Sequence, residues 1–130
     1  MLDEEVRMQR AEIQVVLVPV SDADRAKAFY GDALGWHVDH DQVVNPQLRF
    51  IQITPPNSAC SIAFGPGISP MAPGSLDAAM LVIDDADAAL AELRAAGVEA
   101  EGVDEQAWGR FVTFRDPDGN RWTLQQFPQR

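Results

Sequence analysis

The chain has 130 residues, with 20 acidic and 10 basic side chains, so its formal net charge at neutral pH is −10. This length suffices for one domain with its own core, without disulfides or a structural metal. Because Lys and Arg form no cluster, a nucleic acid is excluded as the expected partner; the acidic balance favours a cationic ligand or simply keeps the protein soluble.

Cys60 is the only cysteine, so the chain can form no internal disulfide. In an apolar segment such a residue is more often a small buried side chain than a reactive thiol. No apolar run has the length of a membrane span or a signal peptide. We therefore expect a cytoplasmic protein that does not contact a membrane.

The first half of the chain predicts one strand, one helix and three further strands. A β-branched run over residues 13–20 is typical of a strand covered on both faces. Ser21 and Asp22 can cap a helix over residues 23–34, and Gly35 suits the left-handed position that ends it. Alternating apolar and polar residues then predict a meander of three short strands, over 36–41, 49–54 and 59–64.

A segment rich in Gly and Pro follows, which predicts a linker over residues 66–75. After it the order begins again with a strand over 78–83 and a helix over 86–96, capped by Asp84 and Asp85 and stopped by Gly97. The remaining strands are predicted over 98–103, 110–115 and 120–127, the last two joined at the turn Asp116-Pro117-Asp118-Gly119.

The two halves repeat one supersecondary unit. Residues 20–24 match residues 83–87 at a spacing of 63, which favours two tandem βαβββ modules. One unit leaves a face of its sheet bare, so we expect an α+β fold in which two mixed sheets curl into a cup-shaped half-barrel with the helices outside. The predicted organisation is an N-terminal arm over 1–12 and a single domain over 13–127, with modules at about 13–65 and 76–127.

Several motifs carry a resemblance that covers essentially residues 13–127. They are Val20-Ser21-Asp22, Arg25-Ala26 and Phe29-Tyr30, Leu34-Gly35-Trp36, Asp84-Asp85, Ala95-Ala96-Gly97-Val98 and, above all, Phe114 to Asn120. The chain resembles the vicinal oxygen chelate superfamily of glyoxalase I, bleomycin resistance proteins and extradiol dioxygenases. The stretch from Gln52 to Ile62 looks like a glyoxalase-like, small-molecule-binding branch. Fold alone does not decide the function.

Metal-dependent members of this family hold a divalent ion with four side chains, and the resemblance places Val15, Ala63, Ala78 and Thr123 at these positions. Val and Ala cannot coordinate a metal, and a neutral Thr hydroxyl is a weak ligand. A shift of one residue would offer only Gln14 and Asp77, and it would turn the strands over. We predict no metal and no cofactor at this site.

A second metal-binding possibility lies in the strand after Trp36. By two-residue alternation His37, Asp39 and Asp41 share one face, with His40 on the other. Successive members of this group are about 7 Å apart along an extended strand, too far to meet one ion without a bend. The pattern therefore favours a solvated strand.

The predicted ligand pocket is the cup itself. Strand parity pairs Val15 with Leu17, Ser61 with Ala63, Ala78 with Met80, and Thr123 with Gln125. These positions give apolar walls with a few hydrogen-bonding groups, as in small-molecule sites; the same positions could equally be filled by core packing.

Two residues near the last hairpin extend this pocket. Trp108 lies in a loop, where it could stack on a ligand or pack against a second subunit, and Arg110 could pair with an anionic group. Trp36 and Trp122 are predicted to face the helices and pack in the core. The direction of Arg49 is left open by the pattern.

Our leading functional hypothesis is a metal-free protein that binds an apolar or aromatic small molecule, cationic ones included, similar to the drug-sequestering bleomycin resistance proteins. The alternatives are a metal-dependent lyase or dioxygenase of the same superfamily, for which no activating group is found, and a dimeric interaction module without a ligand. The resemblance also implies a homodimer, whose cup forms within one chain or between two swapped chains.

Overall fold

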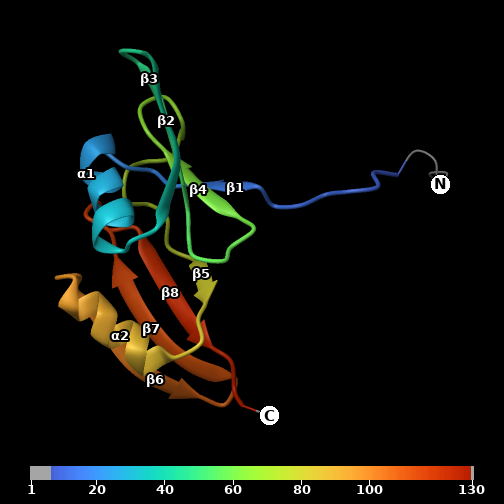
Figure 1. The fold of residues 1–130 in the computed structure, drawn as a ribbon, viewed down its shortest axis with the longest axis vertical. Coiled ribbons are helices and arrows are strands. Elements are labelled where there is room, and N and C mark those ends of the chain that lie inside the picture. The colour runs from blue at the N-terminus through green and yellow to red at the C-terminus, as the bar shows by residue number, and fades with distance from the viewer. Residues whose placement is uncertain (1–6, 130) are drawn as a thin grey trace.

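The computed structural model describes residues 7–129, which form two modules of the same order (Figure 1). The first contains strand β1 (Val15–Leu17), helix α1 (Ala23–Lys27), which continues as the π-helix η2 (Ala28–Ala33), and strands β2 (His37–Asn45), β3 (Leu48–Thr54) and β4 (Ser61–Phe64). The second contains β5 (Ala79–Val82), α2 (Ala86–Ala95), β6 (Ala100–Gln106), β7 (Gly109–Arg115) and β8 (Arg121–Gln126).

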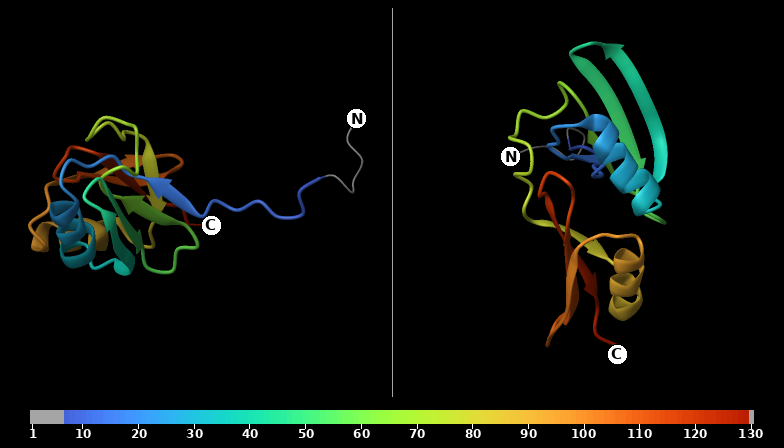
Figure 2. Two further views of the ribbon diagram at one scale, coloured as in Figure 1. Left: turned by 90° about the horizontal axis from the view of Figure 1, so that it is seen from above. Right: turned by 90° about the vertical axis from the view of Figure 1, so that its left-hand side faces the viewer.

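Each module has one four-stranded mixed sheet with the same topology. The strand orders are β1-β4-β3-β2 and β5-β8-β7-β6. In both sheets the first strand lies parallel to the last, and the other pairs are antiparallel. The predicted α+β fold of two tandem βαβββ modules is therefore confirmed, and the second view in Figure 2 shows the two units one above the other.

The predicted ends of both helices are confirmed in detail. The side chains of Asp22 and Asp85 each accept a hydrogen bond from the backbone N–H three residues later, which satisfies a donor that the helix itself leaves unpaired. Gly35 and Gly97 have φ values of 71° and 79°, a conformation that glycine adopts without steric cost.

Several strand boundaries differ from the prediction. The run over 13–20 yields only the three residues of β1, because the carbonyl of Pro19 accepts hydrogen bonds from Gly74 and Asn120 instead of a strand partner. β2 is longer than predicted and forms a hairpin with β3 through a two-residue turn. β6 lies two to three residues later than predicted.

Residues 7–12, the described part of the predicted arm, and residues 13 and 14 extend away from the body without regular structure (Figures 1 and 2). Residues 1–6 of that arm lie outside the described part of the chain. Within residues 7–129 no helix combines the length and apolar character that a membrane span requires.

The hairpin turn between β7 and β8 fastens the two modules together. Tyr30 on η2 donates a hydrogen bond of 2.7 Å to Asp116 Oδ2 and accepts one of 2.9 Å from Trp122 Nε1. The buried Asn120 side chain bonds to Pro19 and to Asp116. Buried polar groups stabilise a fold only when they are paired, and every one of these groups is paired.

One hydrophobic core runs through both modules. Trp36 and Trp122 are buried in it, as predicted, with their rings edge to face and their centroids 5.9 Å apart. Phe114 stacks on Trp122 at 6.4 Å. Such aromatic pairs add specific geometry to the burial of apolar area, so the core also fixes how one module sits on the other.

In both modules an arginine near the start of the third strand forms ion pairs with two carboxylates. Arg49 bonds to Asp24 near the start of α1 and to Asp41 on β2. Arg110 bonds to the equivalent Asp87 on α2 and to Glu105 on β6. In each module the arginine therefore joins a helix carboxylate and a strand carboxylate. Both arginines therefore lie on the helix side of their sheets, which settles the direction of Arg49.

Candidate functional site

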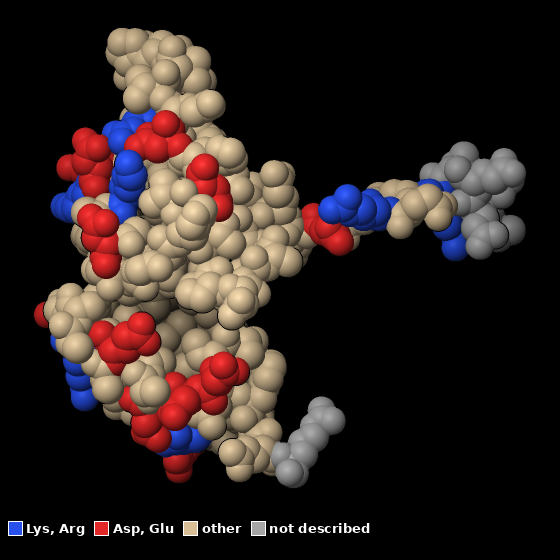
Figure 3. All heavy atoms as spheres, in the orientation of Figure 1, with Lys and Arg blue, Asp and Glu red and all other residues tan. Residues whose placement is uncertain are grey.

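A cleft of about 990 Å³ separates the two modules. In Figure 3 it is visible as a hollow between the upper and lower halves of the molecule. The first module contributes the end of η2, Trp36, the turn 55–58 and the beginning of β4; the second contributes β5, α2 and the helix-facing side of β7 and β8. A volume of this size is sufficient for a drug-sized ligand.

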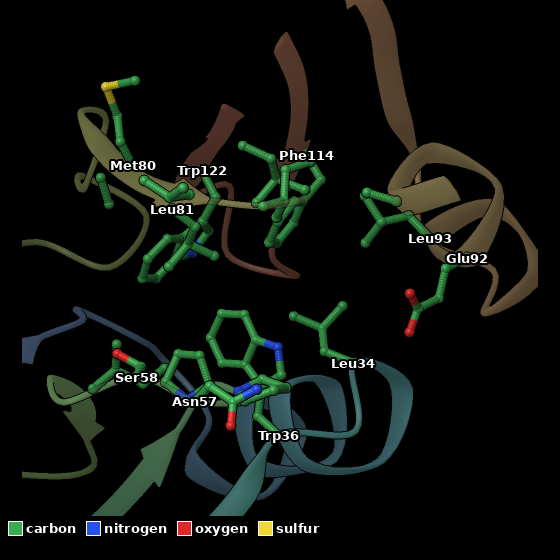
Figure 4. A pocket seen from close by; sticks show the side chains of 18 of the residues that line it. Leu34, Trp36, Asn57, Ser58, Met80, Leu81, Glu92, Leu93, Phe114 and Trp122 are labelled. Atoms are coloured by element: carbon green, nitrogen blue, oxygen red, sulfur yellow. The ribbon is translucent and has the colours of Figure 1, made fainter. Parts of the chain in front are cut away.

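The walls of the cleft are mainly aromatic and aliphatic. Figure 4 shows Trp36 and Leu34 on one side, facing Trp122, Phe114 and Leu81 on the other. The aromatic rings are held in place by the core contacts described above. A rigid aromatic wall of this kind is suited to a flat apolar ligand, because stacking then costs little conformational entropy.

The charged residues that line the cleft are all acidic. Asp84, Asp85 and Glu92 line it, and none of the described lining residues is Lys or Arg. Figure 4 shows the Glu92 carboxylate between Leu34 and Leu93, at the edge of the space. Fixed negative charge beside low-dielectric walls attracts a cation and repels an anion.

Three of the predicted pocket residues line this cleft: Ser61, Ala78 and Met80. Cys60, which is half-buried, also lines the cleft. β5 is an edge strand, and residues of both its faces border the cleft. The cleft therefore reaches around the β5 edge onto the sheet face that the sequence pattern assigned to the cup.

The remaining predicted pocket residues on the strands lie on the sheet faces away from the helices; they are Val15, Leu17, Ala63, Thr123 and Gln125. Val15 pairs with Ser61 and Leu17 with Ala63 across β1 and β4; Met80 pairs with Thr123 and Val82 with Gln125 across β5 and β8. Each set shares one face of its own sheet, and the structure does not bring the two sets together in one cavity. Their role in a ligand pocket stays a prediction.

The structure places Trp108 and Arg110 in different surroundings. Trp108 is 62% exposed at the turn between β6 and β7, and its carbonyl accepts a hydrogen bond from Gln125. Arg110 lies on the helix side, where hydrogen bonds from the guanidinium lower the pKa of Asp87 and raise the pKa of Arg110. Its role as an anion-binding residue also stays a prediction.

The four positions that the resemblance assigns to a metal do not suit one. Val15 and Ala63 offer no donor atom, Ala78 precedes β5, and Thr123 lies on β8 beside Met80. Hard divalent cations require carboxylate or several other oxygen ligands. Among residues 7–129 no three His, Cys, Asp or Glu side chains gather as a metal-binding group, so this donor set does not fit the family's ion.

The predicted alternation of His37, Asp39 and Asp41 is wrong, because β2 contains a bulge between Val38 and His40. Asp39 stays on the face of His37, whereas Asp41 turns to the helix side and pairs with Lys27 and Arg49. Hydrogen bonds from Arg49 and Lys27 hold the pKa of Asp41 well below its usual range. An extra residue in one strand has this effect on every later side chain.

The sequence pattern missed the lining contributed by Leu34, Glu92 and Leu93. Strand parity identifies which residues share a sheet face, but it says nothing about how two modules pack against each other. The positions of the two helices could have indicated the cleft, because both helices begin and end at equivalent positions of the repeat.

Comparison with known proteins agrees with this architecture. Residues 12–124 match the family model of the Glyoxalase/Bleomycin resistance protein/Dioxygenase superfamily. The uncharacterized protein YetH of Bacillus subtilis (strain 168) is 26% identical over 117 residues, which is 88% of this chain and 98% of YetH.

Two solved structures share the fold at full length. TnmS3, an antibiotic binding protein from Streptomyces sp. CB03234, is 36% identical with a TM-score of 0.85 over 94% of this chain and 100% of its own. A superfamily member from Sphaerobacter thermophilus DSM 20745 is 28% identical with a TM-score of 0.80, over 92% of this chain and 99% of its own. The chain belongs to the glyoxalase/bleomycin resistance protein/dioxygenase superfamily.

Proposed function

We propose that this protein binds a flat aromatic cation in the cleft between its modules and sequesters it without changing it chemically. The carrying observation is the lining of the cleft, which combines Trp36, Trp122 and Phe114 with carboxylates and no described Lys or Arg. Apolar walls supply affinity and the carboxylates select the charge. The antibiotic-binding role of TnmS3 supports a small-molecule ligand.

A sequestering protein requires no activating group, which agrees with the side chains at the family's metal positions. Val15, Ala63 and Ala78 supply no Lewis acid ligand. The Glu92 carboxylate is better placed to hold a positive charge than to assist a reaction, because it lies at the edge of the cleft and not at its aromatic centre. Binding alone is therefore the function that this geometry supports best.

We further propose that a second copy of the chain covers the open sheet faces. Several apolar side chains are exposed on the edge strands β1 and β5 and at the turn between β6 and β7: Leu17, Met80, Val82 and Trp108. A partner on these faces would also enclose the predicted cup residues.

The dimer is tested by sedimentation at micromolar concentration, where we expect twice the mass of the chain. Val82→Asp places a charge on the open face and should shift the species to the monomer. Glu101→Gln on β6, an exposed position far from the β5 edge, serves as a control and should remain dimeric. A monomeric wild-type protein would contradict the proposal.

The ligand proposal is tested with three anthracenes that share one ring system and carry an aminomethyl, a hydroxymethyl or a carboxylate group. Their binding is followed by quenching of the tryptophan fluorescence. We expect the aminomethyl compound to bind most tightly and the carboxylate most weakly.

A matched pair of variants on α2 locates the binding site. Ala88 and Ala91 are both exposed helix residues, but only Ala88 lines the cleft. Ala88→Phe fills part of the cleft and should weaken binding of the aminomethyl compound about tenfold, whereas Ala91→Phe should not change it. Equal effects of the two variants would show that the compound binds elsewhere.

A further inference from the structure

Four polar side chains form a continuous hydrogen-bonded chain on the sheet of the first module. His37 Nδ1 lies 3.0 Å from Asp39 Oδ1, Thr54 Oγ1 donates to Asp39 Oδ2, and Thr54 Oγ1 lies 2.6 Å from Ser61 Oγ. The chain crosses β2, β3 and β4 in that order. His37 pairs with Thr54 across β2 and β3, and Asp39 lies on this same face before the bulge takes effect on the later side chains of β2.

The chemistry of the carboxylate fixes the direction of every bond in this chain. An ionised carboxyl group only accepts hydrogen bonds, so His37 Nδ1 and the Thr54 hydroxyl must both donate to Asp39. The hydroxyl proton of Thr54 is then used, and Thr54 Oγ1 accepts from Ser61. Both ends consequently present acceptors: the lone pairs of Ser61 Oγ and, in neutral His37, Nε2.

Asp39 keeps its negative charge in this arrangement. The hydrogen bond from Thr54, followed by that from His37, lowers the pKa of Asp39 below its ordinary value despite partial burial. The charged and titratable groups that act on it are His37 and His40. Arg49 on β3 and Lys27 on α1 are bound to Asp41 on the opposite face of the sheet.

The chain connects two cavities. Ser61 lines the cleft between the modules, whereas His37, Asp39 and Thr54 line a smaller hollow of about 390 Å³. The turn 55–58 borders both spaces, and Figure 4 shows its Asn57 and Ser58 at the cleft. A ligand in the cleft can therefore extend a substituent past this turn.

We propose that the hollow beside the turn 55–58 binds an amino group of the ligand next to His37, with the Asp39 carboxylate as its acceptor. This inference rests on the proposed function and names the ligand class: an aromatic body in the cleft with a primary or secondary ammonium group on a short arm. An ammonium group offers only donors, so it matches the charged acceptor Asp39. The described lining of the hollow contains no Lys or Arg that would compete for Asp39.

The same chemistry excludes other substituents. A carboxylate or phosphate would be repelled by the charge of Asp39, and an apolar group would leave this carboxylate unpaired. A hydroxyl group can donate one hydrogen bond but gains nothing from the charge. We therefore expect the ammonium form to be preferred over the hydroxyl form by about tenfold, in the range of a charge-assisted hydrogen bond.

The test uses the aminomethyl and hydroxymethyl anthracenes and the variant Asp39→Asn, which keeps the size of the side chain and removes its charge. This variant should weaken binding of the aminomethyl compound about tenfold and should leave the hydroxymethyl compound nearly unchanged. Asp104→Asn removes the same charge from an exposed position that lines neither cavity, and it should change neither affinity.

A second measurement requires no variant. The chain contains only two histidines, so proton–nitrogen NMR of the imidazoles resolves His37 from His40. Neutral His37 should carry its proton on Nδ1, and the aminomethyl compound should shift its Nε2 resonance while His40 stays unchanged. An Nε2-protonated His37 would overturn the proposed bond direction.

The outcomes separate the two proposals. If the aminomethyl compound binds more tightly than the carboxylate but Asp39→Asn changes neither affinity, the amine-binding hollow is wrong while the proposed function stands. If none of the three binds, the proposed function fails, and the ligand class assigned to the hollow fails with it.

Discussion

Tyr30 donates a hydrogen bond of 2.7 Å to Asp116 and so links the helix of the first module to the hairpin turn of the second. The same phenol oxygen accepts from Trp122 Nε1, and Trp122 forms part of the cleft wall. The turn that marks the family in the sequence is therefore also the fastening between the modules. The geometry of the cleft depends on it.

The first prediction concerns alkaline pH. Burial, and then the charge of Asp116, raises the pKa of Tyr30 far above its ordinary value of 10.0. Above that value the unfolded chain loses the phenol proton while the folded chain keeps it, so stability is complete below about pH 10 and falls as the pH rises further. Since Tyr30 is the only tyrosine, the near-ultraviolet absorbance of tyrosinate should appear only together with unfolding.

Tyr30→Phe provides the control for this titration. The variant lacks the phenol proton, so its stability should change less between about pH 9 and about pH 11 than that of the wild type. A tyrosinate signal that develops in the folded protein near pH 10 would contradict the buried, hydrogen-bonded phenol.

The second prediction concerns Asn120, whose fully buried side chain bonds to Pro19, Asp116 and Leu76. Asn120→Ala removes these bonds and leaves buried groups unpaired, so we expect a loss of about 2–4 kcal/mol in the free energy of unfolding, measured with urea. Asn45→Ala removes one hydrogen bond to Gln47 at an exposed turn and should cost less than about 1 kcal/mol. Equal losses would be inconsistent with the fastening.

The third prediction compares the two repeated ion pairs. One pair of the first set, Arg49 with Asp41, is 20% and 21% exposed, and only its second partner Asp24 is exposed (83%), whereas both partners of Arg110 are 71% exposed. Water screens the second set more strongly, so Arg49→Gln should lower the melting temperature by more than Arg110→Gln. Thermal unfolding at neutral pH measures both, and the reverse order would show that exposure does not decide their contributions.

Acid should weaken the same network. The pKa of Asp41 lies well below the ordinary value of 3.8 because Arg49 and Lys27 donate hydrogen bonds to it. A carboxyl group with a lowered pKa contributes stability above its unfolded pKa, and this contribution is lost as the pH falls below about 4. Asp41→Asn lacks this titration, so urea unfolding should show a smaller acid-induced loss for the variant than for the wild type.

Cys60 offers a chemical reporter of the cleft. It is the only cysteine and it lines the cleft half-buried, so a thiol reagent should modify it without competition from another residue. Saturation with the aminomethyl anthracene should slow this reaction several-fold, because the bound ligand excludes the reagent. The same rate with and without the compound would show that it does not occupy this part of the cleft.

The sequence carries most of the fold because the relevant signals are local. Asp22 and Asp85 cap the helices, Gly35 and Gly97 end them, and the repeat fixes the order of elements in each module. Capping and left-handed glycine positions depend on a few neighbouring residues, so a single sequence reveals them. The turn beginning at Asp116 belongs to the same class of signal.

The candidate site was less accessible because it depends on non-local geometry. One bulge in β2 turned Asp41 to the face opposite to Asp39. The arrangement of the modules placed Glu92 of α2 across the cleft from Leu34, on the side opposite to the predicted cup. Neither event leaves a periodic pattern in the sequence.

The most direct test of the account is the ratio of affinities for the aminomethyl and carboxylate anthracenes, measured on the wild-type protein by tryptophan quenching. The acidic, aromatic cleft predicts saturable binding of the aminomethyl compound at least about tenfold tighter than binding of the carboxylate. Absence of saturable binding, or tighter binding of the carboxylate, would contradict the account.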